Sequence, residues 1–246
     1  MEKTKNIGSS KILTGYTYPL AIFVSTANNL WDREGKLSTY NKIRVAQKWL
    51  SNQAGRYNAS LSFHNGGCYG LDNDIIVDYI PQASGRSNEY VDWVRFLLYK
   101  IGWKNPIDLY NRMIKETSCQ NLHILMFANS RGTSYSIPHG SLCDEAKYFV
   151  EGCFLYRRYK SGYEICPASI AHEILHIYGA WDLYQTFEVS KEQADKAGEL
   201  FPNDIMHKTA WDIDELNISP FTAWRIGWTD KQEDWYEWFR PKNIYC

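Results

Sequence analysis

A glutamate bracketed by two histidines constrains this chain more than any other feature. Residues 170–184 read IAHEILHIYGAWDLY and contain His172, Glu173, His176 and Asp182. Pro167 suits the first turn of a helix, and Gly179 suits its end. Residues four apart lie on one side of a helix, so His172 and His176 can direct their imidazoles at one ion. The stretch therefore predicts a helix that carries a metal site.

The two acidic residues of this stretch have different expected roles. Glu173 lies about 100 degrees around the helix from His172, beside the ion, where it can accept a proton from a metal-bound water. Gly179 tolerates a positive φ, so the chain can turn back and offer Asp182 as a third ligand. The alternative is an ordinary amphipathic helix whose histidines are held by hydrogen bonds. Only 6 of the 246 residues are histidines, and two of them bracket a glutamate at ligand spacing, which favours the metal site.

Elements of both kinds alternate along the chain. Short apolar or alternating runs predict strands over residues 18–24, 60–64, 74–80, 123–128 and 148–156. Helical spacing and N-cap signals predict helices over residues 41–53, 88–101, from 106 onward and from 167 to 179. This order favours an α/β (α+β) fold with a mixed twisted sheet. We expect a single domain over 1–246, with the sheet and motif helix in 1–180 and a small C-terminal subdomain in 181–246.

Composition narrows the class of protein further. The formal net charge is −1 and no basic patch stands out, so no nucleic-acid partner is expected. No run approaches the roughly 20 apolar residues of a membrane span. The N-terminus lacks the apolar stretch of a secretory signal, so we expect a cytoplasmic protein, or a secreted one if a leader was removed. The 6 cysteines form no C-x-x-C pair, and free thiols are expected.

Residues 171–182 resemble the metzincin metalloproteases, whose extended motif is H-E-x-x-H-x-x-G-x-x-H. The sequence here is HEILHIYGAWD, with Asp182 in place of the last histidine, which is similar to the snapalysin-like branch. The stretch PNDIMHKTA is similar to the methionine turn of that family, with Met206 as the methionine. Lys208 occupies the place where some relatives have a metal-binding tyrosine, so no such ligand is expected. Residues 218–228 resemble the C-terminal helix of these enzymes, with Ser219 as its N-cap.

The resemblance implies a zinc-dependent endopeptidase acting on a peptide or protein substrate. Zn²⁺ would be held by His172, His176 and Asp182, with Gly179 and Met206 as structural residues and Glu173 as the general base. The family's edge strand implies substrate-binding residues at Thr133, Ser134, Tyr135, Ser136 and Ile137. Two alternatives remain: a zinc hydrolase of a small-peptide or non-protein amide, and a non-catalytic binding or toxin-like module. Residues 74–117 have no counterpart in the resemblance, and the sequence indicates no oligomeric state.

Overall fold

A mixed sheet of seven strands forms the centre of the molecule. The computed structural model describes residues 8–81, 89–138 and 150–242. The strands are β1 (Gly15–Ser25), β2 (Leu61–Phe63), β3 (Cys68–Tyr69), β4 (Ile75–Ile76), β5 (Asn121–Gly132), β6 (Tyr135–Ile137) and β7 (Gly152–Tyr159). Their order is β2-β1-β5-β7-β6, and β3 and β4 also pair with β1. All pairings are parallel except that of β6 with β7, so the predicted α/β class with a mixed sheet is confirmed.

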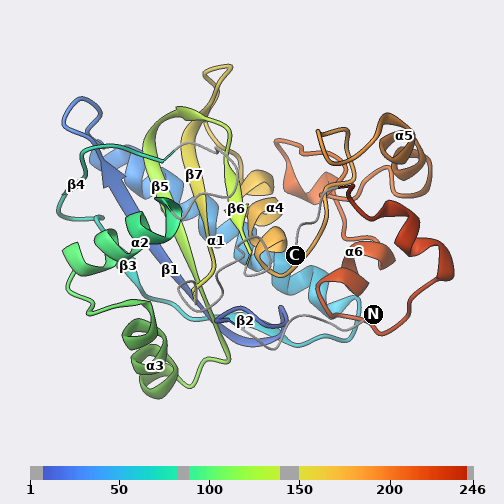
Figure 1. Cartoon of the computed structure of the whole chain (residues 1–246), viewed down its shortest axis with the longest axis horizontal. Coiled ribbons are helices and arrows are strands. Elements are labelled where there is room, and N and C mark those ends of the chain that lie inside the picture. Colours follow the sequence, from blue (N-terminus) through green and yellow to red (C-terminus); the bar gives the residue numbers. More distant parts are fainter. Residues whose placement is uncertain (1–7, 82–88, 139–149, 243–246) are drawn as a thin grey trace.

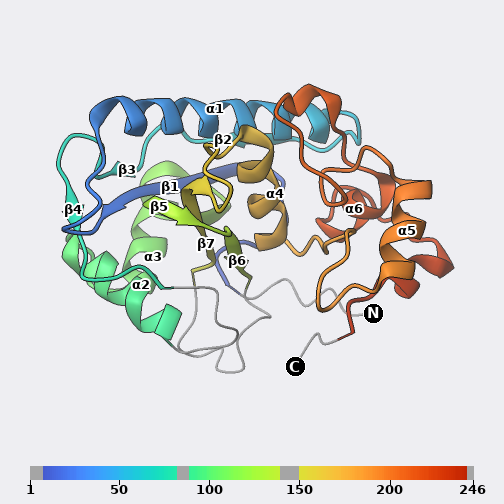
Figure 2. The ribbon, with the colours of Figure 1, turned by 90° about the horizontal axis from the view of Figure 1, so that it is seen from above.

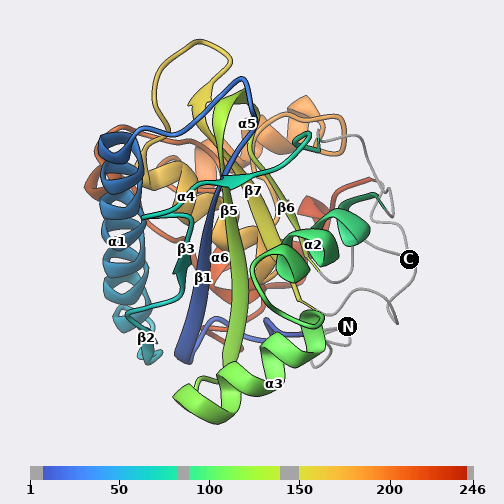
Figure 3. The same ribbon diagram turned by 90° about the vertical axis from the view of Figure 1, so that its left-hand side faces the viewer.

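Helices cover both faces of the sheet. Helices α1 (Arg33–Gly55) and α4 (Pro167–Ile177) lie on one face, and α2 (Glu89–Lys100) and α3 (Pro106–Thr117) on the other (Figure 3). Successive strand residues point to opposite faces, so Phe23 packs in the first core while Leu20 and Ile22 pack in the second. Because both faces are covered, β1 and β5 read as nearly continuous apolar runs.

The chain after α4 forms a group of short helices beside the sheet (Figures 1 and 2). These are α5 (Lys191–Leu200), η2 (Ile213–Glu215), α6 (Pro220–Arg225) and η3 (Asp234–Phe239). Phe239 of η3 is buried against Phe201 and Phe221. The C-terminal aromatic residues therefore close an apolar cluster, and the subdomain boundary at residue 180 stays a prediction.

Several predicted elements have different bounds. The strand expected over 74–80 is confined to Ile75–Ile76, because β1 ends at Ser25 and offers Val77 only one further hydrogen bond. Helix α1 begins at Arg33, well before residue 41, because Asp32 caps it by accepting from the backbone of Gly35. Strand β7 begins at Gly152, and residues 148 and 149 of the prediction lie outside the described residues. Strand β3 and helix α5 were not predicted.

Two predictions about the whole chain concern thiols and membranes. Cys68, Cys119, Cys153 and Cys166 are free thiols, as predicted, whereas Cys143 and Cys246 lie outside the described residues. Among the helices in the described part of the chain, none has both the length and the apolar character needed to cross a bilayer.

Candidate metal centre

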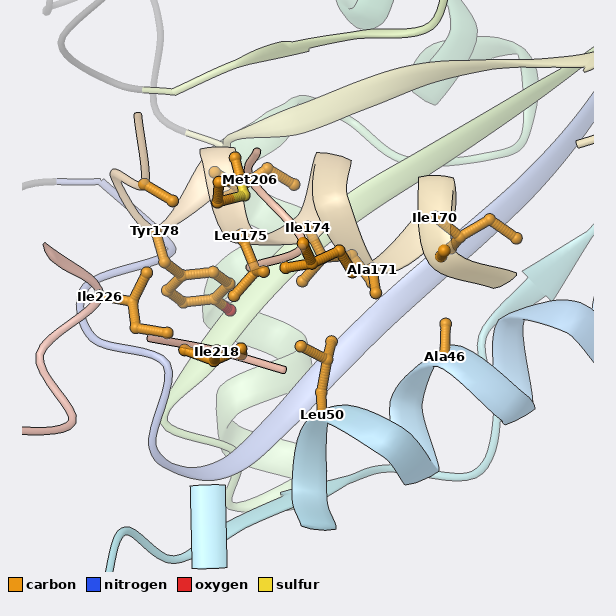
Figure 4. Close-up of a cluster of buried hydrophobic side chains, with 14 of the residues drawn as sticks. Ala46, Leu50, Ile170, Ala171, Ile174, Leu175, Tyr178, Met206, Ile218 and Ile226 are labelled. Carbon is orange, nitrogen blue, oxygen red and sulfur yellow. The ribbon is translucent and has the colours of Figure 1, made fainter. Parts of the chain in front are cut away.

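Helix α4 is anchored in the core along most of its surface. Pro167 occupies its first turn, as predicted, and the extended Cys166 is its N-cap. Ile170 and Ile174 are completely buried and face Leu50 and Ala46 of α1 (Figure 4). This packing fixes the rotation of the helix, and with it the direction of the two histidines.

The end of α4 returns the chain toward those histidines. Gly179 has a φ of 93°, a left-handed conformation that side chains with a Cβ disfavour. The backbone N–H groups of Gly179 and Ala180 donate to the carbonyls of His176 and Leu175 at 2.9 and 3.1 Å. The tight turn predicted at Gly179 is therefore confirmed, and it brings Asp182 alongside the helix.

Three ligand atoms converge on one point. His176 Nε2 lies 3.0 Å from His172 Nε2, and Asp182 Oδ1 lies 3.1 and 3.3 Å from these two nitrogens respectively. Ligands about 2.0–2.1 Å from a tetrahedral zinc are roughly 3.3 Å from one another. Within the described residues, His172, His176 and Asp182 are the one group of this kind that could hold a metal ion. The predicted ligand set is brought together with spacings that fit such an ion.

Backbone carbonyls determine which ring nitrogens face this point. His172 Nδ1 lies 3.0 Å from the carbonyl of Ile205, and His176 Nδ1 lies 3.0 Å from that of Ala180. A carbonyl can only accept, so each Nδ1 carries a proton, and when the ring is neutral the lone pair on Nε2 faces the centre. This is the tautomer that a metal-binding histidine requires.

The third ligand atom has no other partner. Asp182 Oδ1 is buried and accepts no hydrogen bond of proper geometry from the described residues, although both Nε2 atoms are near. A buried carboxylate oxygen without a donor is costly. Three acceptors therefore meet where a cation would satisfy all of them.

The electrostatics of the site favour positive charge. Burial lowers the pKa of His176, but the neighbouring Asp182 and then Glu173 outweigh it and raise that pKa to about 9. Burial opposes ionisation of Asp182, but His176 and His172 hold the pKa of its carboxyl far below the usual range. A proton and a metal ion therefore compete for the same point.

Glu173 lies beside the ligands and is held by the edge strand. It is only 7% exposed, and the Ser136 hydroxyl of β6 lies 2.7 Å from both its Oε2 and its backbone oxygen. A hydroxyl has one proton, so Ser136 donates to one of these oxygens at a time. Either bond ties the predicted general base to the strand.

The predicted substrate strand is only partly realised. Tyr135, Ser136 and Ile137 form β6, at an edge of the sheet where it pairs with β7 alone, whereas Thr133 and Ser134 precede the strand. The Ser134 hydroxyl accepts from the backbone of Tyr156 at 3.3 Å, so it is turned inward. Among the five predicted positions, Ser136 forms a hydrogen bond with Glu173.

Met206 lies on a tight turn. The backbone N–H groups of His207 and Lys208 donate to the carbonyl of Asp204 at 2.9 and 3.1 Å. Met206 is completely buried, in the same apolar cluster as Leu175 and Tyr178 (Figure 4). The predicted methionine turn thus exists as a turn, and the carbonyl of Ile205 within it contacts the candidate ligand His172.

One residue near the ligands was not predicted from the sequence. The Tyr184 ring lies 6.1 Å from that of His172, and burial followed by the charges of Asp182 and Glu173 raises the pKa of its hydroxyl. Its side chain is partly exposed, and its hydroxyl interacts with the carboxylate of Asp182. Its position two residues after Asp182 in the sequence was the available signal.

Comparison with known proteins adds no family to this description. No protein-family model matches the chain, and no curated protein matches it either.

Proposed function

We propose that the protein is a zinc-dependent endopeptidase of the metzincin type. One observation carries the proposal: two oriented imidazoles and an undonated carboxylate oxygen converge beside Glu173. Structural zinc is normally closed by a fourth protein ligand, which leaves no open position for a water. A purely structural site therefore needs no glutamate to accept a proton from such a water. Among the described residues, no fourth ligand atom joins this group.

Zinc is the metal that this donor set suits best. Two imidazole nitrogens and one carboxylate oxygen are ligands of catalytic zinc sites, which keep one position open. Bound there, zinc would polarise a carbonyl and lower the pKa of water toward neutrality.

The protein side chains would move and hold the protons. Glu173 would accept a proton from the attacking water and pass it to the leaving amine, which is general acid–base work that typically contributes 10²- to 10⁴-fold. Ser136, 2.7 Å away, would hold that carboxylate in place. Tyr184, whose ring lies 6.1 Å from that of His172, would donate a hydrogen bond to the developing oxyanion.

The surrounding fold supports the metzincin assignment. The motif helix, a glycine turn, a buried methionine turn and a capped C-terminal helix follow one another in the order that the resemblance implies. The edge strand β6 beside Glu173 could pair with an extended peptide through main-chain hydrogen bonds. We therefore propose a peptide or protein as substrate.

The test is an unbiased peptide-library digest with the zinc-loaded protein. Glu173→Gln is expected to keep zinc bound and to lower the rate of cleavage by about 10²- to 10⁴-fold. Glu199→Gln, on the exposed face of α5, is the matched control and should cleave at the unaltered rate. Failure of the zinc-loaded protein to cleave any peptide overturns the proposal. Rates that do not rise with peptide length would instead point to a small amide substrate.

A further inference from the structure

The turn of residues 204–207 makes one contact with the proposed ligand His172 and two with Leu183, the residue after the proposed ligand Asp182. The Ile205 carbonyl accepts from His172 Nδ1 at 3.0 Å. The Met206 carbonyl accepts from the backbone of Leu183 at 2.8 Å, and the Leu183 carbonyl lies 2.9 Å from His207 Nδ1. Leu183 directly follows Asp182, so this turn restrains one histidine ligand and the backbone beside the carboxylate ligand.

A single buried carboxylate holds that turn. Asp204 is completely buried, and its Oδ1 accepts from the backbone of Met206 at 2.7 Å. Its Oδ2 accepts from the backbone of Ser219 at 2.8 Å and from the Thr222 hydroxyl at 2.7 Å. Ser219 and Thr222 form the start of α6, so the carboxylate links the turn to that helix.

Each oxygen of Asp204 therefore has a separate task. One fixes the backbone within the turn, and the other fixes the turn against α6. The Ile205 carbonyl lies between the two residues that Oδ1 connects, so its direction depends on this bond. Groups that orient a metal-binding histidine typically affect metal affinity by about 10- to 100-fold.

We infer that Asp204 is a positioning residue of the metal centre: it ties the 204–207 turn to α6 and so orients His172 and the chain beside Asp182. This inference rests on the proposed zinc site. Asp204 touches no ligand directly and acts through the carbonyls of Ile205 and Met206. Glu173 and the proposed ligands supply the chemistry, and Asp204 supplies the alignment of His172 and of the chain beside Asp182.

Two variants test this alignment. In Asp204→Asn, the amide nitrogen cannot accept, so either Met206 or Ser219 loses the acceptor for its backbone N–H. Thr222→Val removes one donor and leaves the other two bonds in place, so it remains informative if Asp204→Asn fails to fold. Met113→Ala, in the core on the opposite face of the sheet, is the control for loss of stability alone.

The measurements are Zn²⁺ affinity by competition with a chelator and the visible absorption of the Co²⁺-loaded protein. Asp204→Asn should weaken Zn²⁺ binding by about 10- to 100-fold and alter the Co²⁺ bands. Thr222→Val should change the Zn²⁺ affinity and the Co²⁺ bands in the same direction but by less. Met113→Ala should leave the affinity and the bands unchanged.

Two results would overturn the inference, and they are distinguishable from failure of the proposed function. If the unaltered protein binds Zn²⁺ and both variants bind it equally well with the same Co²⁺ bands, Asp204 has no positioning role. The same conclusion follows if Met113→Ala weakens binding as much as Asp204→Asn. If the unaltered protein does not bind Zn²⁺, the proposed zinc site fails and the inference fails with it.

Discussion

Glu151 and Asp182 are two largely buried carboxylates that differ in their hydrogen-bond donors. Glu151 is 1% exposed and its Oε2 accepts from the backbone and hydroxyl of Ser9, at 2.8 and 2.6 Å, and from the backbone of Ser10, at 3.0 Å. Asp182 Oδ1 has no donor among the described residues and faces two ring nitrogens instead. The first arrangement is complete in itself, whereas the second could hold a cation. A buried acid is therefore better interpreted from its partners than from its burial.

The largest difference between the two acids is expected when each is changed separately to its amide and the Zn²⁺ affinity of each variant is measured. Four-ligand zinc sites bind with about 10–16 kcal/mol, or roughly 2.5–4 kcal/mol per ligand. Asp182→Asn should therefore weaken Zn²⁺ binding by about 100- to 1,000-fold in a chelator competition, because its amide is a poorer ligand. Glu151→Gln should bind Zn²⁺ as the unaltered protein does. Similar losses in both variants would remove the distinction.

The pH dependence of stability gives the next largest expected effect. Burial raises the pKa of Glu151 from 4.5 to about 7, against the opposing hydrogen bonds of Ser9 and Ser10. The folded protein keeps this proton to a higher pH than the unfolded chain, so the contribution of Glu151 to the free energy of unfolding is largest at low pH. That contribution should fall by on the order of 3 kcal/mol as the pH rises from about 4.5 to about 7.

Urea unfolding of the unaltered protein and Glu151→Gln at several pH values checks this expectation. The difference in unfolding free energy between the two proteins should change across that interval and level off above it. A difference that stays constant with pH would show that Glu151 is ionised in the folded protein throughout.

Addition and removal of metal should produce a somewhat smaller change. At a free Zn²⁺ concentration 100 times the dissociation constant, binding adds about 2.7 kcal/mol to the free energy of unfolding. Thermal unfolding with Zn²⁺ and then with excess chelator should show this gain and its loss. His172→Ala, tested at the same Zn²⁺ concentration, should show little gain, and an equal gain would place the ion elsewhere.

Removal of one donor to Glu151 should have the smallest effect. The Ser9 hydroxyl donates to Oε2 at 2.6 Å, and hydrogen bonds to charged groups contribute about 1.5–3 kcal/mol. Ser9→Ala should therefore lower the free energy of unfolding by roughly 2 kcal/mol at pH 8, measured in urea. The loss should be smaller at pH 5, where the carboxyl is protonated, and an equal loss at both values would contradict this charge assignment.

Local spacing explains why the site was largely predictable from the sequence. His172 and His176 are one helical turn apart, and Pro167 and Gly179 mark the ends of the helix that carries them. These signals lie within a few residues of one another, so no knowledge of the tertiary structure is needed. The mixed sheet was predictable for the same reason, because its apolar runs are continuous.

The partners of these residues could not be predicted in the same way. The Ile205 carbonyl meets His172 across 33 residues, and backbone oxygens carry no mark in the sequence. The short β4 depends on where β1 ends, which is set by tertiary contacts. The early start of α1 was detectable, because its N-cap Asp32 bonds to Gly35 only three residues along the chain. Helix α5 was detectable, because Ser190 and Gln193 form a capping box whose residue types and spacing are visible in the chain.

The edge strands of the sheet in the described residues are short, and this bears on the tendency of the sheet to pair with other molecules. The strands beyond β1 are 3, 2 and 2 residues long, and β6 at the other margin is 3 residues long. A long, flat edge strand can pair with the edge strands of other molecules and so promote aggregation, whereas short, interrupted edge strands do not. The same shortness restricts any main-chain pairing with a visiting peptide at β6 to a few residues.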